Sequence, residues 1–468
     1  MASIPRLVLA GTSSGVGKTT TTVALARALQ RRGLRVALFK CGPDYLDPTY
    51  HARATGAPSH NLDGWMMGRD AVTATFVRAA SGAGSTGAPA DIALIEGVMG
   101  LFDGASPTGE EGSTAQIAKW LGAPVALLVD ASGMARSIAA VAQGFASFDP
   151  ALDVAAVIAN RVGSRGHLDL LRMALRAPPI LGGFPKDEGH AFPERHLGLR
   201  TADQVTLPDT LLDHWAERAE AWLSIDLLLD VARRATDIAA PADAGPPRDA
   251  AAPARCRIGI AADEAFHFYY EDNLRRLEAL GAELVRFSPV HDATLPDVDG
   301  LYLGGGYPEV HAAALASNAS MRAAVAAFAA RGGTIYAECG GLMYLTGGIR
   351  TLGGERFAMA GVLPGEAVMC ERLQALGYVE VETQQPSPVG GAGVRFRGHQ
   401  FRYSELRGMP DDFPRAYTVR RRRGDDVTRE GYAWKNVLAS YVHAHWASNP
   451  AAARAFVDTC VSTREAST

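Results

Sequence analysis

The sequence predicts an α/β protein with two domains, the first of which is a doubly wound parallel sheet. Short apolar runs bounded by Gly, Pro or charged residues alternate with longer helical patterns. The first run leads into a glycine-rich loop, Gly11–Thr19, which opens a predicted helix. A Pro- and Ala-rich segment, residues 239–255, separates this series from a second one and predicts a linker. Since continuously apolar runs are typical of strands buried on both faces, the repeated strand–helix units favour parallel sheets.

The expected elements follow the chain in two series. In the first domain, residues 1–238, a crossover helix is predicted at Thr20–Arg31, and the predicted strands are Leu7–Ala10, Val36–Phe39, Ile92–Ile95, Val125–Val129 and Val154–Ala159. In the second domain, residues 256–468, the predicted strands are Arg257–Ala261, Glu283–Phe287, Leu301–Leu303 and Thr334–Ala337. Alternation over Gly377–Glu382 predicts antiparallel strands later in this domain. Sheets of the doubly wound kind bind ligands at the carboxyl ends of their strands.

Composition narrows the class of protein. A chain of 468 residues is long enough for two or three domains. Its net charge of -4 gives no bulk attraction for nucleic acid or anionic lipid, so neither is expected as a partner. Five cysteines without a CxxC pair indicate neither a disulfide framework nor a zinc site. The first apolar run is too short for a signal peptide and no run approaches a membrane span, so a cytoplasmic location is expected.

The loop after the first predicted strand has the composition and the context of a phosphate-binding loop. Gly15 and Gly17 let backbone N–H groups turn toward phosphate oxygens, Lys18 supplies a point charge, and Thr19 offers a hydroxyl to Mg²⁺. Thr12 stands where the strict pattern has its first Gly. Asn160, after the fifth strand, is a candidate for reading an adenine edge, with an ordinary turn residue as the alternative. The predicted ATP-binding residues are Gly11, Thr12, Ser14, Gly15, Val16, Gly17, Lys18, Thr19, Thr20 and Asn160.

Acidic residues follow the second and third predicted strands. Asp44 and Asp47 come after the second strand, and Glu96 and Asp103 come after the third. Carboxylates at the ends of strands beside a phosphate-binding loop are placed to hold Mg²⁺, directly or through water. We therefore predict Mg²⁺ ligation by Thr19, Asp47 and Glu96.

A second reactive group follows a strand in the other domain. Cys339 lies between the apolar run Thr334–Ala337 and the helical segment that Gly340 begins, which is the arrangement of a nucleophile elbow. The helix N-terminus is expected to lower the pKa of the thiol. His443 and His445 are candidate bases, and the backbone N–H groups of Gly305 and Gly306 are candidate oxyanion donors.

Taken in chain order, these motifs resemble the amidotransferase-synthetases that amidate corrin rings, and within that family the a,c-diamide branch. The resemblance implies a phosphate-binding domain like that of dethiobiotin synthetase, followed by a class I glutamine amidotransferase α/β domain. It covers nearly the whole chain. The motifs that carry it are Gly11–Thr19, Lys40–Pro48, His60–Asp63, Glu96–Gly104, Val129–Gly133, Phe266–Leu274, Leu303–Glu309, Tyr336–Leu345 and Ser440–His445.

The resemblance also implies roles for the residues. Cys339 would be the nucleophile that takes ammonia from glutamine, and His443 its base. In ordinary class I amidotransferases a Glu follows that His by two residues, and His445 stands there in this chain, which leaves the third member of the relay open. The other domain would use ATP and Mg²⁺ to activate the a and c acetate carboxylates of a corrinoid as acyl phosphates. Asp44, Asp47 and Asp103 are the catalytic candidates there.

A ring with many carboxylates needs cationic neighbours, and the sequence leaves its contacts and the assembly open. The substrate-binding candidates are Lys40, Tyr45, Leu46, His60, Asn61, Arg161 and Arg165. The oligomeric state is not determined, and a homodimer is one candidate.

Rival hypotheses come from the same family and from other classes of protein. Cobyric acid synthase and a nickel-tetrapyrrole a,c-diamide synthase are the related alternatives. A partitioning ATPase is the alternative from another class, but its family places a second Lys early in the loop, where Ser13 stands here. A regulatory protein with an inactive amidotransferase domain is disfavoured because Cys339 and His443 are both present.

Overall fold

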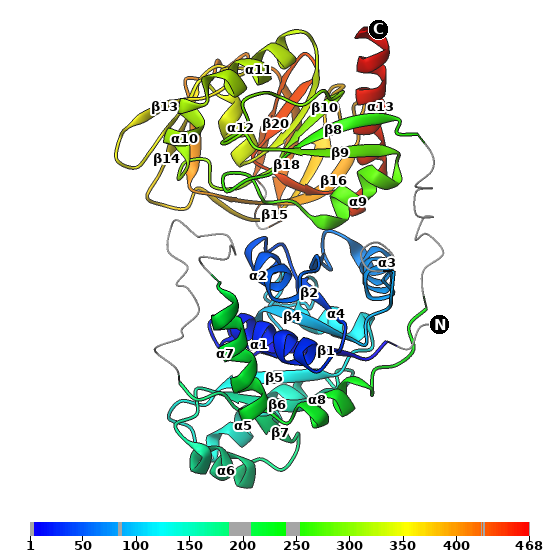
Figure 1. Ribbon diagram of the computed structural model, residues 1–468, viewed down its shortest axis with the longest axis vertical. Helices are drawn as coiled ribbons and strands as arrows, with labels where there is room; N and C mark the ends of the chain where they lie inside the picture. The colour runs from blue at the N-terminus through cyan, green and yellow to red at the C-terminus, as the bar shows by residue number, and fades with distance from the viewer. Residues whose placement is uncertain are drawn as a thin grey trace. The chain divides into compact units, whose positions relative to one another are not determined.

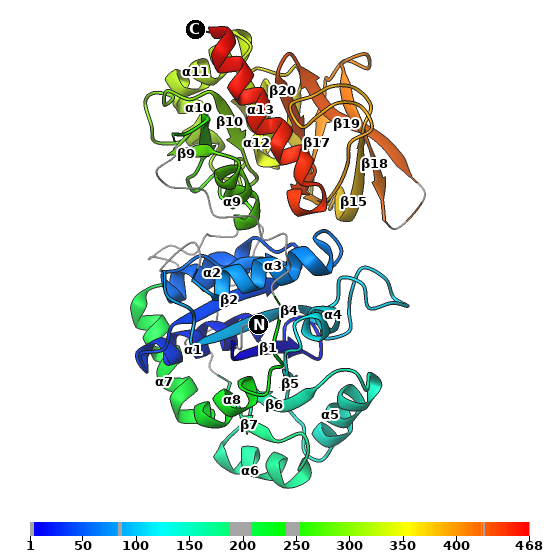
Figure 2. The ribbon, with the colours of Figure 1, turned by 90° about the vertical axis from the view of Figure 1, so that its right-hand side faces the viewer.

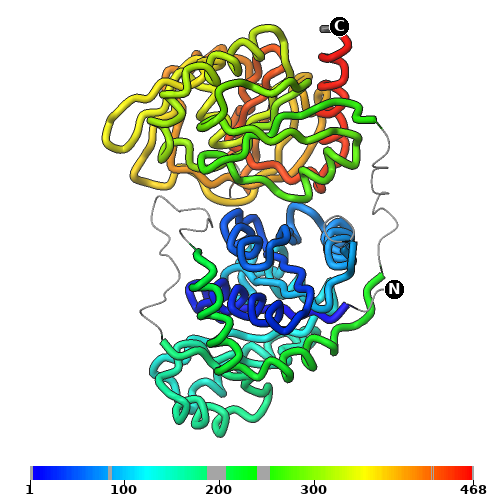
Figure 3. The backbone as a smooth tube through the Cα atoms, viewed as in Figure 1, coloured from blue at the N-terminus to red at the C-terminus, as the bar shows by residue number. Residues whose placement is uncertain are grey.

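The computed structural model describes residues 4–82, 87–186, 207–239, 253–422, 424 and 426–467. The chain divides into two compact units, Met1–Gly245 and Pro246–Thr468. The division falls within the predicted linker, of which residues 240–252 lie outside the described residues. Figure 3 traces the backbone of each unit. Within the described segments, no helix has the length and the apolar character needed to cross a membrane.

The first unit is built on a parallel sheet, as the sequence predicted. Among the described residues it has seven strands in the order β3-β2-β4-β1-β5-β6-β7, and every neighbouring pair is parallel. The predicted apolar runs all lie in strands, whereas the three-residue strands β3 and β7 were not predicted. The bounds are β1 Arg6–Gly11, β2 Val36–Cys41, β3 His60–Leu62, β4 Ile92–Gly100, β5 Val125–Asp130, β6 Val154–Asn160 and β7 Ile180–Gly182.

The helices of the first unit connect these strands (Figure 1). Helix α1 is the predicted crossover helix, and it lies beside α7, to which Arg27 is joined by an ion pair with Asp213 of 2.8 Å. The bounds are α1 Lys18–Arg31, α2 Leu46–Thr55, α3 Gly68–Ala80, α4 Thr114–Trp120, α5 Ser137–Phe148, α6 Arg165–Ala174, α7 Asp209–Trp222 and α8 Ile225–Ala232.

The strand order places three loops at one edge of the sheet. Strand β1 lies between β4 and β5, and β2 lies on the other side of β4. Because all three strands are parallel, the loops after β1, β2 and β4 leave the same carboxyl edge, near the point where the strand order reverses. The glycine-rich loop, Asp44 and Asp103 belong to these loops, whereas Asp47 lies in the first turn of α2 and Glu96 lies within β4 and not, as predicted, after it.

The second unit is built on a mixed sheet. In the described residues its ten strands run in the order β21-β16-β15-β18-β19-β20-β11-β10-β8-β9. Strands β20 to β9 in that order are parallel, and the remainder are antiparallel, which confirms the prediction for Gly377–Glu382. The bounds are β8 Cys256–Ala261, β9 Ala282–Phe287, β10 Gly300–Leu303, β11 Thr334–Glu338, β15 Ala375–Thr383, β16 Arg395–Arg402, β18 Arg415–Arg421, β19 Val427–Trp434, β20 Val437–Ser440 and β21 His443–His445.

A smaller sheet and several helices complete the second unit. The smaller sheet was not predicted; it has the order β13-β12-β14-β17, with bounds β12 Gly348–Arg350, β13 Arg356–Ala358, β14 Glu366–Met369 and β17 Ser404–Arg407. Helix α13 lies across one face of the large sheet (Figure 2), where Phe456 and Val457 pack with α9 residues such as Leu277. The helices are α9 Glu271–Ala279, α10 Ala312–Ser317, α11 Ala319–Ala330, α12 Gly340–Leu345 and α13 Pro450–Ser467, with a 3₁₀ turn at Trp446–Ser448.

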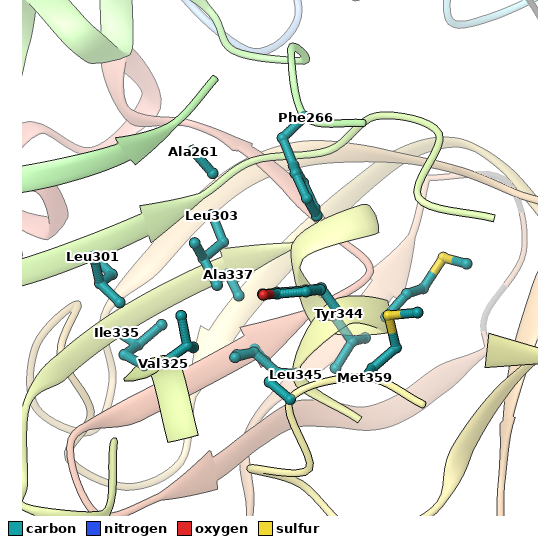
Figure 4. Close-up of a cluster of buried hydrophobic side chains, with 14 of the residues drawn as sticks. Ala261, Phe266, Leu301, Leu303, Val325, Ile335, Ala337, Tyr344, Leu345 and Met359 are labelled. Carbon is teal, nitrogen blue, oxygen red and sulfur yellow. The ribbon is translucent and has the colours of Figure 1, made fainter. Parts of the chain in front are cut away.

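A separate apolar core supports the short helix α12 (Figure 4). Its residues Tyr344 and Leu345 are fully buried, and the ring of Tyr344 meets that of Phe266 edge-on with 5.5 Å between centroids. A helix of six residues is not stable by itself in water, so its position depends on this packing. Burying one large apolar side chain contributes about 1.5–3 kcal/mol. The core therefore fixes the turn that precedes α12.

Candidate active sites

The glycine-rich loop joins β1 to α1 and is held in shape by Asn160. Gly15 and Gly17 have φ values of 79° and 96°, which L side chains rarely adopt. A Cβ on Gly17 would lie 2.2 Å from Asn160 Nδ2, so no larger residue fits there. The same nitrogen donates a hydrogen bond of 2.7 Å to the carbonyl of Val16. Asn160 thus braces the loop, and its contact with adenine stays a prediction.

The ammonium of Lys18 is directed by two carbonyl groups. Its Nζ donates hydrogen bonds to the carbonyls of Ser13, at 3.0 Å, and Met99, at 2.6 Å. Met99 has a φ of 47°, an uncommon conformation for a residue with a side chain. Lys18 therefore lies across the glycine-rich loop, as the lysine of a phosphate-binding loop must.

A buried cluster of charged residues lies beside Thr19. The Thr19 hydroxyl donates to Glu96 Oε1 at 2.8 Å and lies 3.3 Å from Asp47 Oδ1. Lys40 Nζ bridges the two acids, 2.7 Å from Asp47 Oδ2 and 2.9 Å from Glu96 Oε1. The structure thus brings together the three predicted Mg²⁺ ligands. In the described residues no group of three or more His, Cys, Asp or Glu forms a metal site, but Mg²⁺ commonly takes one or two carboxylates together with phosphates and water.

The charges in this cluster stabilise one another. Burial alone would raise the pKa of Glu96, but Lys40 and His51 outweigh it and hold the pKa below its usual range. Burial likewise opposes the charge of Lys40, and Asp47 and Glu96 outweigh it, so the pKa of Lys40 is raised. His51 Nε2 lies 2.7 Å from Glu96 Oε2, and its Nδ1 lies 2.9 Å from Ser59 Oγ. The contacts therefore favour the charged forms of Lys40 and Glu96, and His51 is hydrogen-bonded to Glu96.

His51 was not among the predicted site residues. It lies four residues after Asp47 on α2, so the two side chains share a helix face. That spacing is a signal that sequence reasoning could have used. Lys40, predicted as a contact of the ring, is buried between Asp47 and Glu96.

The remaining acids of the first site have different surroundings. Asp44 Oδ1 accepts hydrogen bonds from the backbone N–H groups of Leu46 and Asp47, at 2.8 and 3.1 Å, and so fixes the start of α2. Asp103 is exposed, and its Oδ2 accepts from the N–H of Gly100 at 2.9 Å. The backbone after Gly100 is bonded to Gly11 through Leu101 N–H, so Asp103 belongs to a loop beside the glycine-rich loop.

The predicted ring contacts near β3 are buried. Asn61 Nδ2 donates to the carbonyls of Gly42, at 2.9 Å, and Asp44, at 2.8 Å, which ties β3 to the loop after β2. Tyr45, Leu46 and His60 are also largely buried. Their part in binding the ring stays a prediction.

The two predicted arginine contacts lie in different places. Arg161 donates to the Gly15 carbonyl at 2.9 Å and forms an ion pair with Asp130, so it lies on the glycine-rich loop. Arg165 stacks over the ring of Trp222, 3.8 Å from its centroid, at the end of α7. The described contacts therefore associate Arg161, and not Arg165, with the glycine-rich loop.

In the second unit Cys339 forms a sharp turn between β11 and α12. Its φ of 47° and ψ of -100° are strained for a residue with a side chain. Its N–H donates to the Ser440 carbonyl at 2.7 Å. A Cβ on Gly340 would come within 3.0 Å of Pro308, and a Cβ on Gly341 within 2.2 Å of the Leu303 carbonyl. The turn therefore requires the two glycines that follow the cysteine, and it confirms the predicted strand–turn–helix arrangement.

His443 and the glycine loop after β10 lie against this turn. A Cβ on Gly305 would be 2.4 Å from His443 Cε1, so only glycine lets the ring approach. The Gly306 nitrogen would lie 3.1 Å from a Cβ on Gly340, and Gly306 has a φ of 156°. The structure thus brings together the predicted thiol, base and oxyanion loop.

The pKa of the thiol differs from the expectation. Burial raises the pKa of Cys339 to about 12, and the charge of Glu309 adds to the effect. Arg402 and the backbone N–H of Gly340 lower it only in part, so the expected net lowering by the helix N-terminus was wrong. The helix has only six residues, and its dipole is correspondingly small. Burial also lowers the pKa of His443 to about 3, so its imidazole is neutral at pH 7 and can accept a proton.

His445 has its own contacts. Its ring packs on Tyr270 with 4.6 Å between centroids, and its Nδ1 accepts a hydrogen bond of 3.3 Å from the Ala447 N–H. His399, which the sequence did not single out, stacks on His443 with 5.0 Å between centroids and 19° between planes. Its Nδ1 is 2.9 Å from the hydroxyl of Tyr270. The role of His445 in catalysis stays a prediction.

The fold and the two sites define a class of enzyme that joins a nucleotide-binding unit to a glutamine amidotransferase unit. Residues 7–199 match the family described as "CobQ/CobB/MinD/ParA nucleotide binding domain". Residues 257–451 match the family described as "CobB/CobQ-like glutamine amidotransferase domain".

Full-length relatives define the family more narrowly. The chain is 50% identical to the cobyrinate a,c-diamide synthase of Leptospira interrogans serovar copenhageni, over 98% of this chain and 99% of that one. It is 51% identical to that of Syntrophotalea carbinolica, with the same coverage, and 44% identical to that of Salmonella typhimurium, over 95% of each chain. The chain belongs to the cobyrinate a,c-diamide synthase family, which confirms the resemblance drawn from its motifs.

Proposed function

We propose that this protein converts cobyrinate to its a,c-diamide with glutamine as the nitrogen source and ATP as the activating reagent. The observation that supports the proposal is the presence on one chain of the residues of two candidate sites. One has a cysteine elbow with His443 against it, and the other has a phosphate-binding loop with a buried acid cluster. Relatives that match both units from end to end are named for this reaction.

In the glutaminase unit Cys339 attacks the side-chain amide of glutamine. His443 accepts the thiol proton and the sulfur bonds to the amide carbon, while the backbone N–H groups of Gly305 and Gly306 are the proposed donors to the developing oxyanion. The C–N bond then breaks, and His443 returns the proton to the leaving ammonia. Water hydrolyses the thioester and releases glutamate. Burial raises the pKa of Cys339 and lowers that of His443, which favours the thiol and the neutral imidazole before glutamine binds.

In the synthetase unit Lys18 and the backbone of the glycine-rich loop bind the phosphates of ATP. An acetate carboxylate of the corrinoid attacks the γ-phosphorus of ATP, and the bond from the γ-phosphorus to the bridging oxygen of the β-phosphate breaks. The products are ADP and an acyl phosphate on the corrinoid. Ammonia then attacks the acyl carbon. The bond between that carbon and the phosphate oxygen breaks, inorganic phosphate leaves, and an amide remains. Two acetates react in turn at this one site.

The residues around Thr19 fit a magnesium ion. They offer one hydroxyl and two carboxylates, and the cationic Nζ of Lys40 already lies between the carboxylates. Mg²⁺ held by Thr19, Asp47 and Glu96 would neutralise charge on the phosphates as the carboxylate attacks. Lys40 and His51 hold the pKa of Glu96 below its usual range and orient its carboxylate, and Lys40 also contacts Asp47.

The proposal includes a cytoplasmic location, where thiols stay reduced, and the substrates cobyrinate, glutamine and ATP. All five cysteines are free, and Cys339 needs its thiol for the reaction. A homodimer is the candidate assembly, and the mass of the protein in solution measures it.

Product analysis tests the proposed function. The protein is incubated with glutamine, ATP, Mg²⁺ and in turn cobyrinate, hydrogenobyrinate, cobyrinate a,c-diamide and a nickel tetrapyrrole with acetate side chains. We expect two added amides on cobyrinate, located by fragmentation on the a and c acetates. Amidation of the ready-made a,c-diamide instead would contradict the proposal.

A further inference from the structure

The residue before the nucleophile is a buried carboxylate held by donors from three strands. Glu338 is the last residue of β11 and is almost fully buried. Its Oε1 accepts hydrogen bonds from the Tyr336 hydroxyl, at 2.8 Å, and the Ala444 N–H, at 2.9 Å. Its Oε2 accepts from the Tyr302 hydroxyl at 3.0 Å. An isolated carboxylate is costly to bury, and these donors offset that cost.

The same carboxylate faces the candidate base. Glu338 Oε2 lies 4.0 Å from His443 Nδ1, and the side chains are only 1% and 2% exposed. The Ala444 N–H that binds Oε1 belongs to the residue next to His443. The acid is therefore fixed to the strand that carries the base, and a small rotation of the imidazole brings Nδ1 into hydrogen-bond range. Catalytic hydrogen bonds are often long before substrate binds and shorten in the complex.

We infer that Glu338 is the positioning residue of His443, the third member of the relay that the sequence left open. The inference rests on the proposed glutaminase reaction. The Nδ1–H of His443 is directed at Glu338, and Nε2 accepts the thiol proton of Cys339. Glu338 stabilises the imidazolium that results and takes no proton itself. The proton on Nε2 later leaves with ammonia.

The other neighbours of His443 do not offer this interaction. His399 stacks face to face on the imidazole, and a stacked ring lies outside the plane in which Nδ1–H points. His445 packs on Tyr270, and its Nδ1 already accepts the Ala447 N–H. Among the described residues, Glu338 is the carboxylate within ion-pair distance of His443.

The buried position of Glu338 makes its protonation sensitive to the charge on His443. Burial raises the pKa of Glu338 to about 7, although the Ala444 N–H and the two tyrosine hydroxyls lower it in part. Protonation of His443 would place a cation beside the carboxylate and favour its ionised form. The titratable groups near the pair include Tyr302 on β10, Tyr336 on β11, Cys339 after β11, Tyr269 before α9, Tyr417 on β18 and His399 on β16.

The test compares Glu338→Gln with a matched control in the full-length protein. Glu430 is also buried and accepts three hydrogen bonds, from Gly431 N–H, Ser440 Oγ and Tyr441 N–H. Glutaminase kcat and KM are measured from pH 6 to 9 for wild type, Glu338→Gln, Glu338→Asp and Glu430→Gln. Thermal unfolding of each variant shows whether it is folded.

We expect Glu338→Gln to lower kcat for glutamine by at least about tenfold with little change in KM, and Glu430→Gln to lower it by less than about threefold. Glu338→Asp keeps the charge and should recover part of the loss. The rising limb of kcat/KM should move to lower pH in Glu338→Gln, because an imidazolium without its carboxylate partner loses its proton more readily. Loss of the carboxylate also lowers the pKa of the Cys339 thiol, which moves the limb in the same direction, so the fall in kcat and its recovery in Glu338→Asp carry the test.

Three outcomes overturn the inference: an unchanged kcat, a limb that moves to higher pH, or equal losses in Glu338→Gln and Glu430→Gln. If Glu338→Gln does not fold, Tyr336→Phe and Tyr302→Phe each remove one donor to the carboxylate and decide the matter by the same shift of the limb. If wild type hydrolyses no glutamine, the proposed function fails. If wild type hydrolyses glutamine and the Glu338 variants show the same kinetics as wild type, the inference fails but the proposed function stands.

Discussion

Replacing Lys40 with Met tests the buried charge cluster of the first unit. Lys40, Asp47 and Glu96 have side chains only 3%, 2% and 0% exposed, and the lysine bridges the two acids. Met has a similar volume and no charge, so the variant leaves two carboxylates without their shared cation. Removing one member of a buried ion pair costs about 3–5 kcal/mol. In a unit of this size that corresponds to a fall in Tm of roughly 6–20 °C.

Lys119 provides a matched control at the surface. It also lies between two carboxylates, those of Glu110 and Asp149, but its side chain is 22% exposed and theirs are 49% and 23% exposed. Exposed pairs contribute about 0–1 kcal/mol because water screens them. Lys119→Met should therefore change stability far less than Lys40→Met.

The effect of Lys40→Met has a defined pH dependence. In wild type Lys40 holds the folded-state pKa of Glu96 below its ordinary value of 4.5, so this acid contributes stability above that pH and loses it on acidification. In the variant burial raises the pKa with less opposition. The penalty is then present at pH 7 and shrinks as the pH falls through the raised pKa.

The free energy of unfolding in urea is measured from pH 4 to 8, with hydrogen exchange in peptides of the first unit as the readout. A loss at pH 7 within 1 kcal/mol of that in Lys119→Met would refute the reasoning. So would a loss that stays constant on acidification. Added Mg²⁺ should recover part of the loss in Lys40→Met if Asp47 and Glu96 bind the ion.

The remaining predictions concern catalysis. Cys339→Ser should lower glutaminase activity by roughly 10³-fold or more and leave synthesis from free ammonia intact, which ammonia-dependent assays of amide product will show; retained glutaminase activity would remove Cys339 as nucleophile. Lys18→Ala should abolish synthesis from glutamine and from ammonia alike, because neither can proceed without an acyl phosphate, and normal ammonia-dependent synthesis would contradict the assignment of the loop. His443→Ala should lower glutaminase kcat by roughly 10²–10⁴-fold, and His445→Ala by less; the opposite order would exchange their roles.

The parts of the fold that could be predicted are those set by local sequence. Apolar runs such as Val125–Val129 are buried on both faces, so their pattern is the same wherever the strand lies in the sheet. The glycine-rich loop and the cysteine elbow were also predictable, because each needs small residues at fixed spacing. The three-residue strands β3 and β7 and the four-stranded sheet have no such pattern, since pairing with neighbours and not periodicity defines them.

The parts of the sites that could not be predicted depend on contacts between distant residues. His51 meets Glu96 across 45 positions. Glu338 on β11 lies 4.0 Å from His443 on β21, although the two strands are not neighbours in the sheet. The pKa of Cys339 could not be inferred from its helix, because burial and Glu309 decide its sign. Arg165 carries the charge expected of a ring contact, yet the structure stacks it on Trp222.

A quenched time course tests the central claim most directly. Wild type is mixed with cobyrinate, glutamine, ATP and Mg²⁺, and samples are analysed for monoamide, diamide, ADP and glutamate. Since one phosphate-binding loop must activate two carboxylates, we predict free monoamide that rises and then falls, with one ADP and one glutamate per amide formed. Diamide without any free monoamide would contradict release between the two rounds, and amide formed without matching ADP would contradict the acyl-phosphate mechanism itself.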